Sequence, residues 1–226
     1  MGDLEPKIPL WSDFDKTAVA GPTTLIRRMR KFPLGPMVGF NEFIDGTING
    51  GLDFRGVISR RPDIAQRRRV MLRSIADNDL RVLTDVELVL TGNEDKKGAF
   101  VVDQARKSGT AVLLDDKPHE VGESLAGALR LNHAVERYML SRIPGRVITP
   151  VRVVLGAVNH RKTFDNINEL IEKIGGGFNT VIDSRERVTF YNPDYSLDVF
   201  HLPDYSAEAG YEFATTVLMG TPPDIQ

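Results

Sequence analysis

Short apolar runs alternate with helical patterns along most of this chain, and this alternation limits the folds open to it more than any other feature. The apolar runs predict strands over residues 10–14, 56–59, 86–91, 111–114 and 151–158. The patterns between and after them predict helices over residues 62–76, 97–107, 124–140 and 164–174. Strands that alternate with helices are typical of βαβ units, in which helices cover a parallel sheet. The sequence therefore predicts an α/β fold with a parallel sheet and helices on both faces.

Two regions lie outside this alternation. Residues 38–55 contain an Asp-Gly pair and an Asn-Gly pair, which are typical of tight turns because Gly and Asn tolerate positive φ angles. We therefore expect a small hairpin insertion after the first strand, preceded by a short basic helix over residues 23–31. Later apolar runs predict extra strands in the C-terminal part, at residues 180–182, 188–191 and 197–202.

The composition fits a single domain. The chain has 226 residues, of which 41% are hydrophobic and 27% are charged, as in globular proteins. We expect residues 1–226 to form one domain, with 18–55 as a small cap or flap insertion and 175–220 as a C-terminal elaboration. The chain contains no cysteine, which excludes disulfides, thiolate metal sites and cysteine nucleophiles.

Hydropathy gives no indication of a membrane partner. No stretch approaches the roughly 20 apolar residues that a membrane helix needs. The first nine residues include acidic residues and no long apolar run, so we expect no signal peptide and a cytoplasmic location. The sequence does not indicate an oligomeric state.

The net charge of −2 does not point to a nucleic-acid partner either, but one stretch is strongly basic. We interpret it as a solvated helix face. The alternative is a surface that attracts an anionic substrate or a polynucleotide. Its arginines are Arg60, Arg61, Arg67, Arg68, Arg69 and Arg73.

Two carboxylates stand at the end of the first apolar run. Asp13 and Asp15 are separated by one residue, and Thr17 follows two positions later. One carboxylate can attack phosphorus to form an aspartyl-phosphate, and a second can protonate the leaving oxygen and later activate water. Mg²⁺ needs only one or two carboxylates besides substrate oxygens and waters. The motif suits Mg²⁺-assisted phosphoryl transfer, although Asp-x-Asp pairs also occur in solvated loops and helix caps.

Polar residues also follow the next three strands: a hydroxyl, then a lysine pair, then an acidic pair. They are Ser59, Lys96 with Lys97, and Asp115 with Asp116. Because ligands of open parallel sheets bind outside the carboxyl ends of the strands, we expect all of them to meet Asp13 in one crevice. A hydroxyl and a lysine there would hold phosphoryl oxygens, and the second acidic pair would complete a Mg²⁺ site.

In this order, the residues resemble the motifs of the haloacid dehalogenase (HAD) superfamily of aspartate-nucleophile phosphatases. The pentapeptide that starts at Asp13 is similar to the motif D-x-D-x-[TV], and Ser59 is similar to the Ser or Thr of the second motif. Lys96, followed by small and apolar helix residues, is similar to the third motif. The tetrapeptide that starts at Asp115 is similar to the fourth motif in its DD-x-P form. The resemblance covers residues 8–122.

The resemblance implies a nucleophile, an acid/base and a metal site. Asp13 would be the nucleophile and a Mg²⁺ ligand. Asp15 would be the general acid/base, with its backbone carbonyl on the metal. Asp116 would be a further metal ligand, with Asp115 at the position just before it. The additional acidic residue that the family often carries after the fourth motif would be Glu120, whose side chain is one carbon longer, or would be absent here.

The resemblance also implies three supporting roles, two of which have rival residues. Thr17 would steady the motif loop. Ser59 would donate to a phosphoryl oxygen, unless Thr91 at the end of the next strand takes that role. Lys96 would neutralise charge between the nucleophile and the phosphate, and Lys97 competes for the same role.

These roles imply a Rossmann-like domain that acts as a Mg²⁺-dependent phosphatase. It would hydrolyse phosphomonoesters of a phosphorylated small molecule or a nucleotide through an aspartyl-phosphate. The alternatives are a HAD-like binding or scaffold module without turnover, and a phosphotransferase to an acceptor other than water. We also expect the turn at residues 45–51 to form a mobile flap near the mouth of the site.

Overall fold

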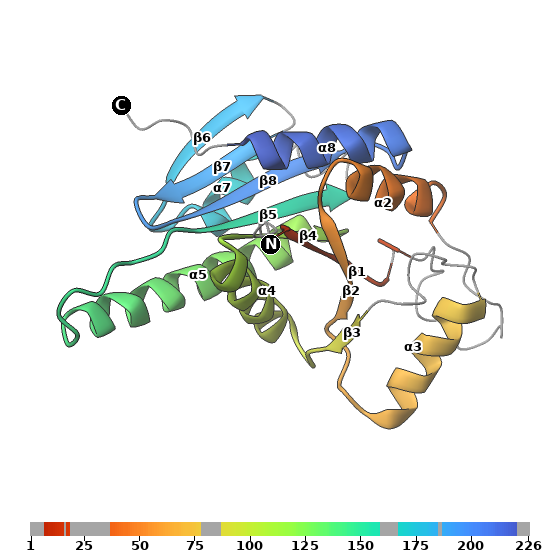
Figure 1. Ribbon diagram of the computed structural model, residues 1–226, viewed down its shortest axis with the longest axis horizontal. Helices are drawn as coiled ribbons and strands as arrows, with labels where there is room; N and C mark the ends of the chain where they lie inside the picture. Colours follow the sequence, from red (N-terminus) through yellow and green to blue (C-terminus); the bar gives the residue numbers. More distant parts are fainter. Residues whose placement is uncertain are drawn as a thin grey trace, which may run out of the picture.

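A single eight-stranded sheet organises the protein in the computed structural model, which describes residues 7–15, 17–18, 37–77, 87–158, 167–184 and 187–220 (Figure 1). The order of the strands across the sheet is β3-β2-β1-β4-β5-β8-β7-β6. Their bounds are β1 Pro9–Asp13, β2 Asp53–Ser59, β3 Glu87–Leu90, β4 Thr110–Asp115, β5 Val151–Val158, β6 Asn179–Ser184, β7 Arg187–Asn192 and β8 Tyr195–Leu202.

Most of the sheet is parallel. β1 lies between β2 and β4 and pairs in parallel with both, and β3, β5 and β8 continue the parallel arrangement outward. β6 and β7 form an antiparallel hairpin whose second strand pairs with β8. The predicted parallel sheet and the extra C-terminal strands are therefore confirmed.

Helices cover both faces of this sheet, as the sequence predicts. Their bounds are α2 Phe40–Asn49, α3 Ala65–Asp77, α4 Glu94–Ser108, α5 Pro118–Leu140, α7 Ile167–Ile174 and α8 Ala207–Met219. Neighbouring residues of a strand point to opposite faces. Leu10 accordingly packs in the core beneath α2 and α8, while Trp11 packs in the core beneath α4, α5 and α7. Within the described parts of the chain, no helix has the length and apolar character to cross a membrane.

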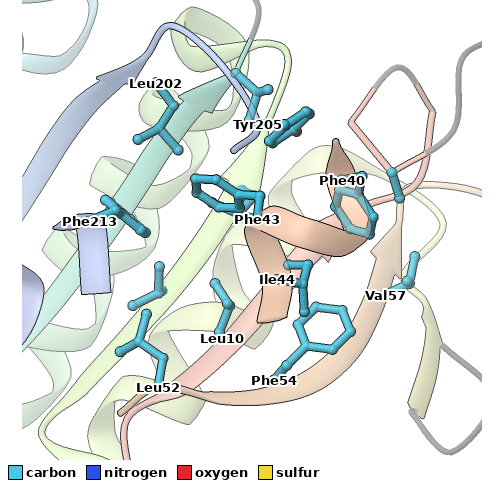
Figure 2. Close-up of a cluster of buried hydrophobic side chains, with 14 of the residues drawn as sticks. Leu10, Phe40, Phe43, Ile44, Leu52, Phe54, Val57, Leu202, Tyr205 and Phe213 are labelled. Atoms are coloured by element: carbon cyan, nitrogen blue, oxygen red, sulfur yellow. The ribbon is translucent and has the colours of Figure 1, made fainter. Parts of the chain in front are cut away.

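Aromatic side chains fill the core beneath α2 and α8 (Figure 2). The Phe43 ring lies 5.1 Å from the ring of Tyr205 and 6.2 Å from that of Phe213, measured between centroids. Phe213 in turn lies edge-on to Phe200 of β8 at 5.5 Å. Each such side chain contributes roughly 1.5–3 kcal/mol when it leaves water, so these contacts tie α2 and α8 firmly to the sheet.

The predicted hairpin over residues 38–55 is wrong, because most of it is helix α2 followed by strand β2. Its glycine pairs suggested turns, but Gly46 lies inside the helix where α8 approaches most closely. A Cβ atom on Gly46 would lie 2.0 Å from the carbonyl oxygen of Ala207, and one on Gly210 would lie 2.1 Å from that of Phe43. Residues 45–51 are consequently no exposed flap. Residues 19–36, which include the predicted basic helix, lie outside the described residues.

Helix α8 was not predicted at all. Its start carries a local signal, since the Ser206 side chain accepts a hydrogen bond from the backbone N–H of Ala209 at 3.1 Å. The interior Gly210 weakens the helical pattern, because glycine costs about 1 kcal/mol relative to alanine inside a helix. Packing against α2 outweighs that cost. The C-terminal elaboration therefore contributes a core helix as well as the extra strands.

We predict that Gly210→Ala destabilises the protein by about 1–3 kcal/mol, because the added methyl group forces α2 and α8 apart. Gly127→Ala is the matched control, since a Cβ atom on this helical glycine of α5 meets nothing within 4 Å. The control should be neutral or stabilising by up to about 1 kcal/mol. Urea unfolding midpoints of the two variants and the wild type measure both effects. Equal stability of the two variants would contradict the close helix contact.

Candidate functional site

Two acidic strand ends meet where the direction of the strand order reverses. From β1 the chain moves outward through β2 and β3, and then returns to the other side of β1 to form β4 and β5. Such a switch point opens a crevice at the carboxyl ends of the strands. Asp13 ends β1 and Asp115 ends β4, so their side chains lie at this crevice, as the sequence predicts.

Asp13, Asp115 and Asp116 form a buried acidic trio. Each offers a carboxylate oxygen, and the three oxygens lie within 4.8 Å of one another. Asp13 is 9% exposed, Asp115 1% and Asp116 6%. Carboxylates are rarely this buried without a partner, so the trio requires a positive charge nearby.

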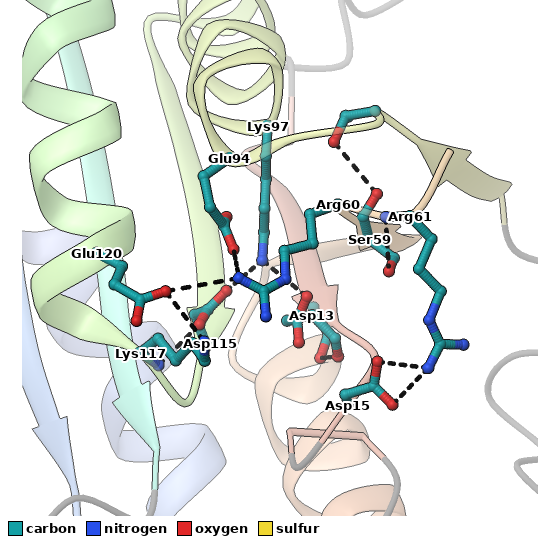
Figure 3. Close-up of polar contacts among 12 residues, drawn as sticks. Asp13, Asp15, Ser59, Arg60, Arg61, Glu94, Lys97, Asp115, Lys117 and Glu120 are labelled. Carbon is teal, nitrogen blue, oxygen red and sulfur yellow. Dashed lines mark hydrogen bonds and ion pairs between the residues drawn. The ribbon is translucent and has the colours of Figure 1, made fainter. Parts of the chain in front are cut away.

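Lys97 supplies part of that charge. Its Nζ atom donates to Oδ1 of Asp13 at 2.7 Å and also donates to Oδ2 of Asp115 (Figure 3). Lys97 is 1% exposed, whereas Lys96 is exposed. The structure therefore corrects the preferred assignment: Lys97, and not Lys96, is the lysine that meets the carboxylates.

The helical phase of α4 determines which lysine points inward. Lys97 lies four and eight residues before Val101 and Ala105, which are both buried in the core under this helix. Residues at this spacing share one face of a helix. This periodicity was visible in the sequence and would have selected Lys97 over Lys96.

A close helix contact holds Lys97 in place. Gly98 faces α5, where a Cβ atom would lie 2.3 Å from Oγ of Ser124. The Ser124 hydroxyl donates to the carbonyl oxygen of Glu94 at 2.7 Å, in the first turn of α4. At the same end, the Asn93 side chain caps the helix by accepting from the N–H of Lys96 at 2.9 Å. These contacts fix the first turn of α4 above the trio.

The trio keeps an excess of negative charge. Three carboxylates against one ammonium group leave a formal charge of −2 when all are ionised. Burial raises the pKa of Asp13 from 3.8 to about 7; Lys97 opposes this effect, while Asp115 and Asp15 add to it. Burial disfavours the charged form of Lys97, but Asp13 and Asp115 outweigh burial and raise its pKa. The site therefore favours binding of further positive charge.

The donor set fits a hard divalent cation. Carboxylate oxygens are the ligands that Mg²⁺, Ca²⁺ and Mn²⁺ prefer, and the formal charge of −2 matches one such ion. Asp13, Asp115 and Asp116 are the residues that could hold it. The expected role of the Asp15 backbone carbonyl as a further metal ligand stays a prediction.

Ser59 is better placed than Thr91 to contact a molecule that binds at the trio. Ser59 is 2% exposed and ends β2, directly beside β1. Its Oγ atom accepts a hydrogen bond from the N–H of Arg61 at 3.4 Å. Thr91 follows β3, one strand further out, and its hydroxyl lies 3.2 Å from the carbonyl oxygen of Ser59. Thr91 thus supports the Ser59 turn from outside.

Asp15 and Thr17 point to partners outside the trio. Oδ1 and Oδ2 of Asp15 lie 2.8 and 2.7 Å from Nη2 of Arg61. Thr17 is fully buried, and its carbonyl oxygen accepts a hydrogen bond from the Tyr205 hydroxyl at 3.0 Å. This contact involves the backbone of Thr17, so the predicted role of its side chain in steadying the loop stays a prediction.

Tyr205 is a site residue that sequence reasoning missed. It lies between β8 and α8, far along the chain from the acidic motif, and no local pattern marks it. Burial raises its pKa well above 10, and the charges of Asp115, Asp116 and Asp13 add to the effect. Tyr205 therefore connects the C-terminal elaboration to the loop that follows Asp13.

Ion pairs surround the mouth of the site. Arg60 reaches Glu94 at 3.3 Å and Glu120 at 3.6 Å, and Lys117 reaches Glu120 at 3.0 Å (Figure 3). The hydrogen bond from Lys117 lowers the pKa of Glu120. Glu120 thus pairs with these cations and is not part of the trio.

A pocket of about 290 Å³ lies at the other end of the same strands. It is lined by residues that include Lys7, Trp11, Arg55 and Lys107, and by none of the trio. The chemistry of the trio thus lies outside this pocket.

Comparisons of the chain with family models, with curated proteins and with solved structures found no match.

We predict that Lys97→Met destabilises the metal-free protein by about 3–5 kcal/mol near pH 8, because it leaves buried carboxylates without their countercharge. Lys96→Met is the matched control and should change the unfolding free energy by less than about 0.5 kcal/mol. Chemical denaturation in the presence of EDTA measures both. Similar losses in the two variants would contradict the buried ion pairs.

We also predict that stabilisation by a divalent ion grows between about pH 6 and about pH 8. In the metal-free protein, the raised Asp13 pKa contributes stability below pH 4 that is lost as the pH rises through 7. Below pH 7 the ion must displace a proton from Asp13, so its affinity should fall about tenfold per pH unit. Melting temperatures with EDTA and with Mg²⁺ or Mn²⁺ measure the effect.

Asp116→Asn should abolish the metal-induced shift in melting temperature. Asp103→Asn, which changes a half-exposed carboxylate of α4, should retain it. A metal-induced shift that is the same at both pH values, or that survives in Asp116→Asn, would contradict the assignment of the trio as a metal centre.

Proposed function

We propose that this protein is a Mg²⁺-dependent phosphatase that hydrolyses phosphomonoesters through an aspartyl-phosphate on Asp13. The observation that carries the proposal is the buried trio of Asp13, Asp115 and Asp116 with Lys97, at the switch point of a parallel sheet. The resemblance of the motifs to the HAD superfamily, in the same order along the chain, supports the same function.

The chemistry would proceed in two displacements. An Oδ atom of Asp13 attacks phosphorus, and the bond from phosphorus to the ester oxygen breaks as that oxygen takes a proton from Asp15. Asp15 then accepts a proton from a water molecule, whose oxygen attacks phosphorus. The bond to Asp13 breaks, inorganic phosphate leaves, and both carboxyl groups return to their initial state. A bound Mg²⁺ would neutralise charge on the phosphoryl oxygens.

Lys97 and Ser59 would stabilise the charge that develops during these steps. Lys97 already donates to Asp13, so its ammonium group would favour the ionised carboxylate and would lie beside the attacked phosphorus. Ser59 ends the neighbouring strand and would offer its hydroxyl to a phosphoryl oxygen. Buried donors of this kind need little reorganisation during the reaction, which is why they are effective.

The substrate would be a phosphorylated small molecule or a nucleotide. The arginine-rich segment suggests an alternative substrate, a polynucleotide. On α3, Arg67, Arg69 and Arg73 are exposed, while Arg68 pairs with Asp63 at 3.2 Å. These cations would contact a phosphate backbone beside the crevice and would make binding dependent on salt.

We predict that Asp13→Asn lowers kcat for p-nitrophenyl phosphate by about 10³-fold or more, because the amide is not an anionic nucleophile. The fold should survive, since asparagine keeps the shape of the side chain. Asp103→Asn, at the half-exposed carboxylate of α4, should keep wild-type kcat. Assays with Mg²⁺ and with EDTA give the metal dependence.

Wild-type activity in folded Asp13→Asn protein would refute the mechanism. Metal-dependent phosphate binding without turnover would favour a binding module. A phosphorylated alcohol among the products, in the presence of candidate acceptors, would favour a phosphotransferase.

A further inference from the structure

The proposed acid/base, Asp15, is held by an ion pair with Arg61. A single guanidinium nitrogen, Nη2, contacts both carboxylate oxygens, at 2.8 and 2.7 Å. The Asp15 side chain is 37% exposed and that of Arg61 is 24% exposed. Ion pairs at this exposure contribute only about 0–1 kcal/mol, so another anion can replace Asp15 at Arg61.

Arg61 stands at the turn that would receive a phosphoryl group. It follows Ser59 by two residues, and its backbone N–H donates to the Ser59 hydroxyl at 3.4 Å. Its guanidinium group lies 5.6 Å from the ring centroid of Phe14, the residue between Asp13 and Asp15. The side chain therefore spans from the end of β2 to Asp15 in the loop after β1 (Figure 3).

The guanidinium group recognises phosphate as well as carboxylate. Its planar set of N–H donors matches both anions, and a phosphoryl dianion carries more charge than one carboxylate. A phosphoryl group that arrives at Ser59 would compete directly with Asp15 for Arg61. The pair that holds Asp15 in the free protein is thus one that a substrate can exchange.

We propose that Arg61 is the receptor for the phosphoryl group of the substrate, and that it exchanges Asp15 for this group when the substrate binds. The exchange frees the Asp15 carboxylate, which then takes up a proton from the phosphomonoester monoanion or from solvent and passes it to the leaving oxygen. Acid/base catalysis is thereby coupled to occupation of the site by phosphate. The inference rests on the proposed function, because it takes a phosphoryl group as the competing anion.

Arg60 provides an internal control for this assignment. It is the neighbouring residue at the same mouth, but its side chain turns away from Asp15, toward Glu94 and Glu120 (Figure 3). Loss of Arg60 removes the same charge from the same region without touching the Asp15 pair. Effects of general electrostatics can therefore be separated from exchange at Arg61.

The test is a double-mutant cycle on the binding of inorganic phosphate, measured by calorimetry in the presence of Mg²⁺. The four proteins are the wild type, Asp15→Asn, Arg61→Gln and the double variant. Asp15→Asn removes the competitor for Arg61, so phosphate affinity should rise by about fivefold or more. In the Arg61→Gln background the same change should alter affinity by less than about twofold.

A second cycle pairs Asp15→Asn with Arg60→Gln. Here the gain from Asp15→Asn should persist at about fivefold, because Arg61 is intact. Asp15→Ala repeats the first cycle without a side-chain amide that could contact Arg61. It also replaces Asp15→Asn if that variant folds poorly. Circular dichroism and melting temperatures verify the fold of each variant.

The exchange is supported if the gain in phosphate affinity from Asp15→Asn depends on Arg61 and does not depend on Arg60. An equal gain from Asp15→Asn in both Arg61 backgrounds, or no phosphate binding in any of the four proteins, overturns it. Turnover of a phosphomonoester is measured separately, and it tests the proposed phosphatase function. Coupling without turnover keeps Arg61 as an anion receptor and removes the phosphatase, whereas turnover with additive binding effects keeps the phosphatase and removes the exchange.

Discussion

The buried contact of Lys97 with Asp13 and Asp115 is the interaction on which the candidate site depends. Removing one partner of a buried charge pair typically costs about 3–5 kcal/mol, because the other partner is left without compensation. The geometry therefore has to be held by packing. Gly98 lets α4 approach α5 closely, and the Ser124 hydroxyl fastens the first turn of α4. Backbone geometry thus sets the position of a charge at the centre of the site.

The C-terminal elaboration supports the same site from the opposite face of the sheet. Helix α8 packs on α2 through glycines. Tyr205, which lies two residues before the start of α8, donates a hydrogen bond to the loop that carries the acidic motif. The rings of Phe40 and Phe43 pack against Tyr205 at 5.7 and 5.1 Å. A part of the chain that resembles no motif thereby helps to position the nucleophile proposed at Asp13.

The polar groups around the crevice differ sharply in exposure, and this difference suggests a division of labour. Lys97 and the trio are buried, so their charges act strongly and reorganise little. The pairs formed by Arg60 and Arg61 at the mouth are partly exposed and individually weak. A fixed interior would perform the displacement, while the exchangeable pairs at the mouth would respond to the charge of an incoming ligand.

The sequence by itself determined the parallel α/β sheet and the acidic strand ends at Asp13 and Asp115, because strand alternation and the position of polar residues after strands are local properties. It also contained the choice of Lys97 in the periodicity of α4. The tertiary structure alone decided that residues 40–49 form a helix, since contact with α8 outweighs the turn preference of its glycines. It alone also brought Tyr205 to Thr17 and Arg61 to Asp15, because no local pattern encodes contacts between segments so far apart in the chain.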